Sequence, residues 1–228
     1  MAGALLTIGF YAVCTVFLAD VITRTSAYVR DTADGGRDVF PRTENSPFLF
    51  VSMLMEIALL RRLLKANPLL WVWEWLFHAS FALIMIRHLR YFLDPVPDWV
   101  TALQPPGLIA GYILPFSLLA ILFIKLFVEK GYVSSANFFL LVLLLAVGAS
   151  GLAMTTVIKT DLVGIKHFAM GIVTFGPAAA PRSYTFFLHF ILFLLFVLYL
   201  PSHILTAPLS IIEARRREEG LKLVLHEK

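Results

Sequence analysis

The stretch WEWLFHASFALIMIRHLRYF, residues 73–92, decides the fold of this chain. It is an almost continuous apolar run of about 20 residues, the length that a helix needs to cross the hydrocarbon core of a bilayer. It also carries two histidines, His78 and His88. Ionisable side chains inside a bilayer are costly, so they indicate a function. The stretch therefore predicts a membrane-spanning helix that carries a site.

The composition of the whole chain also indicates a protein that lies in a lipid bilayer. Of its 228 residues, 59% are hydrophobic and 15% are charged, whereas soluble domains have about 25% charged residues. The net charge of +4 comes from basic residues that flank apolar runs and form no patch, so we expect no nucleic-acid partner. The single cysteine, Cys14, excludes an internal disulfide framework, a thiolate metal cage and a cysteine-ligated cluster.

Four further runs are as long and as apolar, and all five are too continuous to be strands. We therefore predict an all-α membrane protein, a five-transmembrane-helix bundle that forms one domain over residues 1–228. The predicted spans are roughly 3–22, 68–92, 106–127, 134–157 and 183–206.

Three segments outside these spans have a distinct character. Residues 46–64 are apolar but carry Glu56, Arg61 and Arg62, which favours an amphipathic helix lying in the membrane interface. Residues 157–182 mix charged, apolar and glycine residues, and we expect an irregular or re-entrant loop there. Residues 209–228 form a charged tail that we expect in the cytoplasm.

The distribution of Lys and Arg predicts the orientation. With the N-terminus outside and the C-terminus cytoplasmic, 14 basic residues fall on the inner side and 5 on the outer side. We expect a prokaryotic, multi-pass protein of the cytoplasmic (inner) membrane.

Four of the six histidines lie in two of the predicted spans: His78 and His88 in the second, His189 and His203 in the fifth. Two spans, the third and the fourth, lie between them, so the second and fifth helices run antiparallel. His88 and His189 then share an outer depth, and His78 and His203 share an inner depth.

Facing imidazoles at two depths, without Cys, Asp or Glu beside them, favour two bis-histidine b haems, since haem iron takes one axial nitrogen from each side. Zinc fits less well because it prefers three or four close protein ligands. Arg87 and Arg90, next to His88, are candidates for binding haem propionates. The small residues GASG, 148–151, leave room either for a flat macrocycle or for a close helix.

Three stretches carry a resemblance to a known family: residues 73–92, GIKHFAMGIVTFGP (164–177) and LHFILFLLFVLYLPSHILTAP (188–208). With five spans and histidine pairs on the second and fifth, the chain resembles the gamma subunit of respiratory nitrate reductase, a dihaem cytochrome b that oxidises quinol. The sequences of the last two stretches are most similar to those of the membrane cytochrome in the heterodisulfide-reductase-like complex associated with dissimilatory sulfite reductase.

The resemblance implies haem iron ligation by His78 and His203 on the inner side, and by His88 and His189 on the outer side. The chain departs from the nitrate reductase pattern at His203, which follows Pro201 by two residues. In that family the gap between the last two histidines is wider, and the final histidine lies further past the proline. The resemblance also implies a membrane quinone such as menaquinone as substrate and a cytoplasmic iron–sulfur partner subunit. The chain would then be an electron-transfer subunit, with no catalytic residue of its own, and not a complete enzyme.

A quinone site beside the outer haem is expected at Lys166, His167 and Tyr91, where a lysine can bind a quinone oxygen and a histidine can accept a proton at working pH. Two other functions stay open: a small transporter or channel subunit that uses its histidines to move protons or metal ions, and a structural anchor whose histidines only form hydrogen bonds.

Overall fold

The computed structural model describes residues 2–33, 47–128, 135–176, 178–203 and 205, and these residues form helices and no strand. In chain order the helices are α1 (Ala2–Ala33), α2 (Pro47–Leu59), α3 (Arg61–Ala66), α4 (Pro68–His88), the 3₁₀ turn η1 (Leu89–Tyr91), α5 (Asp98–Ala102), α6 (Gln104–Phe123), the π turn η2 (Ile124–Val128), α7 (Ser135–Thr156) and α8 (Leu162–Val173), followed by a last helix, Tyr184–His203. The predicted tail, 209–228, lies outside the described residues.

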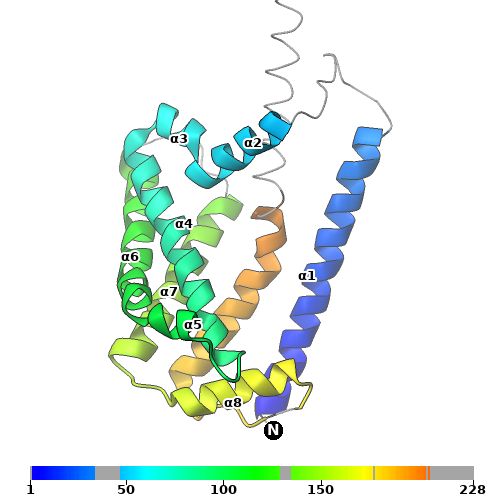
Figure 1. Cartoon of the computed structure of the whole chain (residues 1–228), viewed down its shortest axis with the longest axis vertical. Coiled ribbons are helices and arrows are strands. Elements are labelled where there is room, and N and C mark those ends of the chain that lie inside the picture. Colours follow the sequence, from blue (N-terminus) through cyan, green and yellow to red (C-terminus); the bar gives the residue numbers. More distant parts are fainter. Residues whose placement is uncertain (1, 34–46, 129–134, 177, 204, 206–228) are drawn as a thin grey trace, which may run out of the picture.

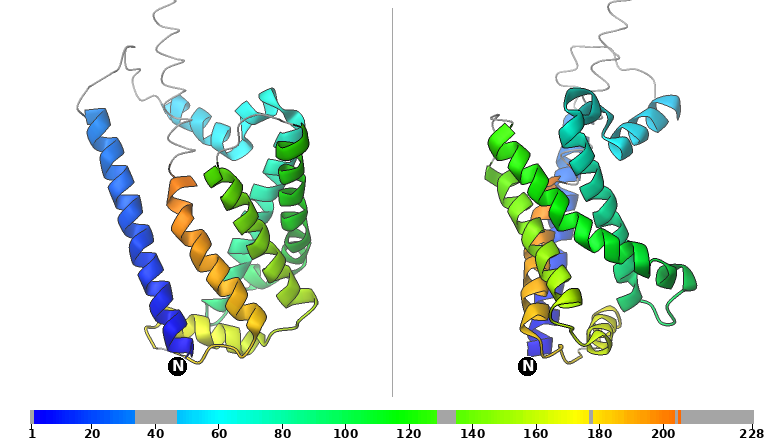
Figure 2. Two further views of the ribbon diagram at one scale, coloured as in Figure 1. Left: turned by 180° about the vertical axis from the view of Figure 1, so that it is seen from behind. Right: turned by 90° about the vertical axis from the view of Figure 1, so that its left-hand side faces the viewer.

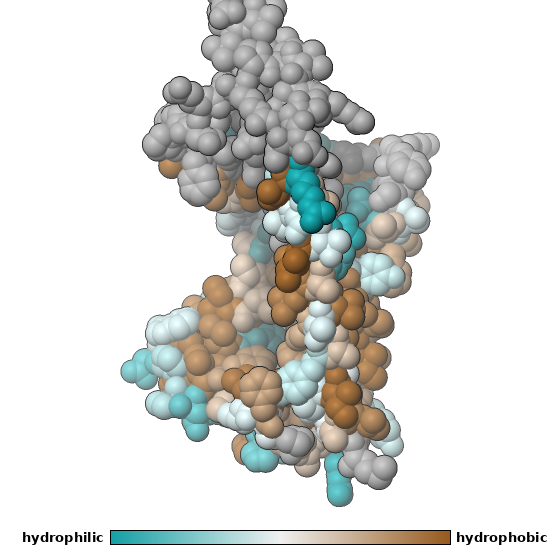
Figure 3. All heavy atoms as spheres, turned by 90° about the vertical axis from the view of Figure 1, so that its right-hand side faces the viewer, coloured by the Kyte–Doolittle hydropathy of each residue, from teal (hydrophilic) through white to brown (hydrophobic). Residues whose placement is uncertain are grey.

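Five of these helices are long and apolar enough to cross a membrane, which confirms the predicted number of spans. They are Ala2–Arg30, Pro68–Tyr91, Gln104–Val128, Ser135–Thr156 and Tyr184–His203. The first is longer than expected, because α1 continues to Ala33 and does not end near residue 22. Apolar residues cover most of the flank of the bundle in Figure 3.

The helices alternate in direction, as Figures 1 and 2 show. The start of α1 and the whole of α8 lie at one end of the bundle, which we call the N-side. α2 and α3 lie at the opposite end, which we call the C-side. α4 runs from the C-side to the N-side, and the last helix runs back.

Local sequence explains where α4 starts. The side chain of Asn67 accepts a hydrogen bond from the Leu70 amide at 2.9 Å, and Pro68 occupies the first turn. An Asn cap satisfies a backbone amide that has no partner within the helix. Proline is tolerated in the first turn because it lacks a backbone N–H, which would have no partner there.

Two hydrophobic clusters hold the bundle together. The larger one joins α4, α6, α7 and the last helix around Leu118 and Ile121, which are almost fully buried. The smaller one, at the N-side, joins α8 to the start of the last helix through Phe168 and Phe186, with Phe10 of α1 packed against it. Four of the five spanning helices therefore meet in the larger core, and α1 packs against the smaller one at the N-side.

The expectation of an irregular or re-entrant loop over residues 157–182 was wrong for the middle of the segment. Instead of an irregular loop, residues 162–173 form the regular helix α8. Asp161 caps it by accepting a hydrogen bond from the Val163 amide at 3.0 Å. Ile165, Phe168 and Ile172 are all buried and lie at a three- to four-residue spacing, which places them on one face of a helix.

The segment predicted as one amphipathic helix over residues 46–64 is helical but divided. α2 ends at Leu59 and α3 begins at Arg61, with Leu60 in the left-handed conformation at φ 49°. The indole nitrogen of Trp71 donates a hydrogen bond to the Leu59 carbonyl at 2.7 Å and so ties the end of α2 to α4.

Candidate functional site

His88, one of the four membrane histidines, lies at the N-side end of α4. Its Nδ1 donates a hydrogen bond to the Ile84 carbonyl at 2.7 Å, one turn earlier in the same helix. A carbonyl can only accept, so Nδ1 carries the proton and Nε2 presents a lone pair. The side chain is half-buried, and its ring lies 5.9 Å from that of Tyr91.

His189, on the last helix, lies within electrostatic range of His88. Its Nδ1 is 3.0 Å from the Ser150 hydroxyl and 3.2 Å from the Val147 carbonyl, both on α7. Nε2 is therefore again the nitrogen left to bind a ligand. Because α4 and the last helix contribute one ring each, these residues form what we call the N-side pair.

The C-side pair consists of His78 and His203. Nδ1 of His78 donates to the Glu74 carbonyl at 2.7 Å, the same arrangement as in His88. His203 lies within electrostatic range of His78, and of Glu74 and Lys125 as well. Glu74 and Lys125 are themselves an ion pair at 3.4 Å, so an ion pair lies at the depth of the C-side histidines.

The geometry thus brings together the histidines that the sequence pairs by depth. Three of the four have Nδ1 held by an oxygen of the protein, which fixes the tautomer and the ring orientation that metal-ligating histidines show. Within the described residues no three His, Cys, Asp or Glu side chains gather at one point. The donor set therefore fits a group that takes two imidazoles from the protein, as bis-histidine haem does.

The two arginines beside His88 have different surroundings. The stem of Arg87 crosses α6 at Gly107, where an added Cβ would meet its Cδ, and its Nε is buried without a hydrogen-bond partner in the described part of the chain. A buried donor without a partner suits an anionic group. The guanidinium of Arg90 lies over the Tyr91 ring, 4.9 Å from its centre.

The residues expected at a quinone site are only partly brought together. Tyr91 packs against the cluster under α8, beside His88. Lys166 points to the same turn and donates to a carboxylate oxygen of Asp94 at 3.0 Å. His167 is exposed, while its neighbours Ile165 and Phe168 are buried.

Four partner residues are not among the site residues that the sequence predicts: Ser150, Asp94, Glu74 and Lys125. Ser150 lies in the small-residue stretch 148–151, which the sequence predicts to leave room for a macrocycle or a close helix. Here Gly148 lets α7 approach Leu114 of α6, and Gly151 lies against His189. A polar residue in an otherwise apolar span is a signal for a contact between helices.

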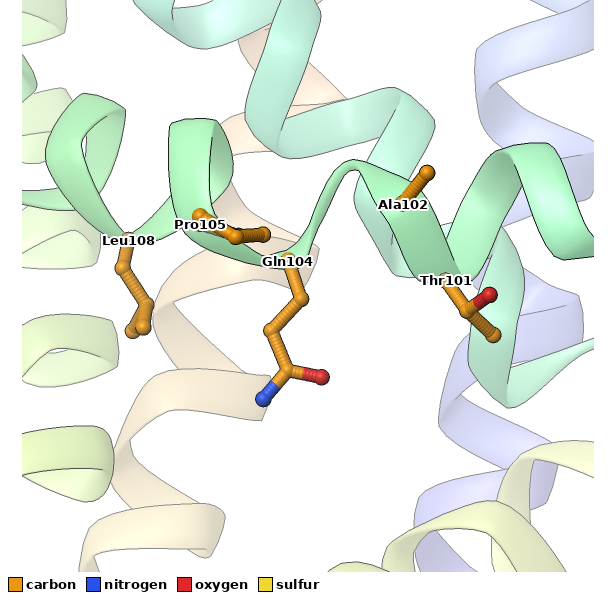
Figure 4. A pocket seen from close by; sticks show the side chains of 5 residues that line it. All are labelled: Thr101, Ala102, Gln104, Pro105 and Leu108. Carbon is orange, nitrogen blue, oxygen red and sulfur yellow. The ribbon is translucent and has the colours of Figure 1, made fainter.

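Neither of the two best-formed surface pockets includes a histidine. One, of about 510 Å³, lies at the junction of α5 and α6 and is lined by Thr101, Ala102, Gln104, Pro105 and Leu108 (Figure 4). The other, of about 620 Å³, is an apolar groove along α4 and α6 that includes Trp73 and Phe116. The candidate site is therefore defined by the four membrane histidines of α4 and the last helix, and not by either of these pockets.

The chain is similar in sequence to two known proteins. No family model and no solved structure matches the chain significantly. Two relatives are named Hdr-like menaquinol oxidoreductase cytochrome b-like subunit. The one from Archaeoglobus profundus is 34% identical over 58% of this chain and 44% of the relative. The one from Archaeoglobus fulgidus is 32% identical over 65% of this chain and 54% of the relative.

The chain spans about half the length of these curated relatives. Together with the five helices that can span a membrane, the match supports a multi-pass integral membrane protein. The resemblance to the membrane cytochrome subunit of heterodisulfide-reductase-like complexes is thereby confirmed.

Proposed function

We propose that this chain is a dihaem cytochrome b subunit that passes electrons between menaquinol and an iron–sulfur partner. The observation that carries the proposal is the pairing of imidazoles from α4 and the last helix at two depths, with Nε2 available on His78, His88 and His189. The names of the relatives, which include menaquinol oxidoreductase and cytochrome b-like, support the same function.

His88 and His189 would hold one haem, and His78 and His203 the other. When bound, the two haems supply one-electron transfer along the membrane normal. The protein's part is to fix the imidazoles and to bind the propionates. Arg87 is suited to the second task through its buried Nε, with Arg90 next to it.

The orientation in this proposal follows the basic residues, with the N-side outside and the C-side in the cytoplasm. An iron–sulfur subunit would dock at the C-side, where α2 and α3 lie, and the C-side pair would be its electron contact. Glu74 and Lys125 give that end of the site a fixed ion pair close to His78 and His203.

The quinone would bind at the N-side, between η1 and α8. Lys166 would donate to a quinone oxygen, in exchange for its present hydrogen bond to Asp94. Tyr91 lies between this position and His88, and the exposed His167 would accept a proton and release it to the outer solution.

The decisive experiment is the haem content of the purified chain. The pyridine haemochrome assay should give two b haems per chain, and dithionite reduction should produce the alpha band of b-type cytochromes. A colourless protein that takes up no haem would instead favour the transporter or anchor functions.

A further inference from the structure

The contact between α7 and His189 sets this residue apart from the other three membrane histidines. His78 and His88 are held by carbonyl groups of their own helix, one turn earlier. The Nδ1 of His189 is held by residues of another helix, 39 and 42 positions away in sequence. The orientation of this ring therefore depends on how α7 and the last helix pack.

The direction of each hydrogen bond at this contact follows from the donors. The hydroxyl of Ser150 donates its proton to the Val147 carbonyl at 2.9 Å. Its oxygen is then left to accept the Nδ1 proton of His189 at 3.0 Å. Ser150 is buried, so water does not readily replace it.

Gly151 adds a steric limit on the same ring. A Cβ built at this position would lie 3.0 Å from Cε1 of His189 and 3.5 Å from Nδ1. The imidazole thus rests on the backbone of α7, and glycine permits this approach.

Resting on the proposed function, we infer that Ser150 and Gly151 are positioning residues for the N-side haem. Ser150 fixes the tautomer of His189 and, by accepting the Nδ1–H bond, raises the basicity of the ring, while Gly151 limits the rotation of the ring. A more basic imidazole would favour the oxidised iron of a bound haem. Ser150 therefore lowers the reduction potential of the N-side haem relative to a chain without this hydroxyl.

Ser150→Ala in the full chain tests the hydrogen bond, with Ser117→Ala as a matched control. Ser117 is buried and also donates to the carbonyl three residues earlier, at 2.9 Å, but that bond is to Leu114 in α6. Ser150→Ala leaves the Val147 carbonyl, at 3.2 Å, as the remaining acceptor for Nδ1 among the described residues. The loss of the closer acceptor should raise the midpoint potential of the N-side haem and shift its low-spin EPR signal, and Ser117→Ala should change neither. Ser150→Thr, which keeps a hydroxyl, should restore the wild-type potential.

Gly151→Ala tests the steric part without removing a hydrogen-bonding group. Its control is Gly111→Ala, because an added Cβ at Gly111 meets nothing within 4 Å. Gly151→Ala should shift the EPR signal of the N-side haem and leave the C-side haem unchanged, whereas Gly111→Ala should match the wild type.

The outcomes separate this inference from the function beneath it. If the wild-type chain binds two haems but Ser150→Ala and Gly151→Ala leave the potential and EPR signal of the N-side haem unchanged, the inference is wrong and the function stands. It is also overturned if Ser117→Ala gives the same shift as Ser150→Ala. A wild-type chain that binds no haem overturns both.

Discussion

The two histidine pairs look alike in sequence, yet their surroundings differ. At the N-side, His88 and His189 lie near the cluster formed by α8, Tyr91 and the start of the last helix. At the C-side, the His78 side chain is 45% exposed and shares its depth with an ion pair, Glu74 and Lys125. α1 packs at its N-side end, through Phe10 and Tyr11.

The difference indicates that the protein builds the two sites by different means. The N-side pair is held by packing and, at His189, by hydrogen bonds to α7. The C-side pair has fewer such constraints and lies where a partner subunit is proposed to dock. Preorganisation favours tight cofactor binding because less ordering is required at the moment of binding.

The largest expected effect is the loss of one haem from the N-side. His88→Ala or His189→Ala should remove that haem and keep the C-side haem, because each variant would delete one of the two ligands proposed for it. Haem content per chain and redox titration measure this loss. His167→Ala, at an exposed histidine outside both pairs, is the control and should retain both haems.

The next largest expected effect is the loss of the C-side haem. His78→Ala and His203→Ala should lose the same haem and give spectra that match one another. If His78→Ala loses the haem while His203→Ala retains it, His203 is not the ligand, and another group near Glu74 and Lys125 must be sought.

A smaller effect is expected on the quinol reaction. Lys166→Ala should slow quinol-driven haem reduction by about ten- to hundredfold, since a charge-assisted hydrogen bond is worth ~1.5–3 kcal/mol and ~1.4 kcal/mol is a factor of ten. His167→Ala should also slow it, through proton release. Stopped-flow spectroscopy with a menaquinol analogue measures the rate.

Lys159→Ala, at an exposed lysine just before α8, is the control for the quinol experiment. Normal rates and normal inhibitor sensitivity in both Lys166→Ala and His167→Ala would place the quinone elsewhere.

The smallest expected effect concerns the N-side packing itself. The Tyr11 hydroxyl donates to the Ile172 carbonyl at 2.6 Å and joins α1 to α8. Tyr11→Phe should lower the free energy of unfolding by about 1 kcal/mol, the net value of one hydrogen bond. Thermal unfolding in detergent measures it, and Tyr112→Phe, at a tyrosine that is 55% exposed, should have no effect.

Much of the architecture was predictable because its signals are local. Apolar runs of spanning length gave the membrane as solvent and the number of crossings, and these signals need no knowledge of neighbours. Alternating crossings then placed His88 with His189 and His78 with His203. The helix α8 was not predicted because segment 157–182 mixes charged residues and glycines with apolar ones. The apolar face formed by Ile165, Phe168 and Ile172 was therefore not recognised.

By itself, the sequence determined that four histidines share two depths of a five-helix membrane protein. Only the tertiary structure decided which groups orient those histidines. Ser150 and His189 are 39 residues apart, and whether they touch depends on how α7 and the last helix rotate against each other. Hydropathy and spacing along one helix carry no information on that rotation, because it is set by side-chain packing between helices.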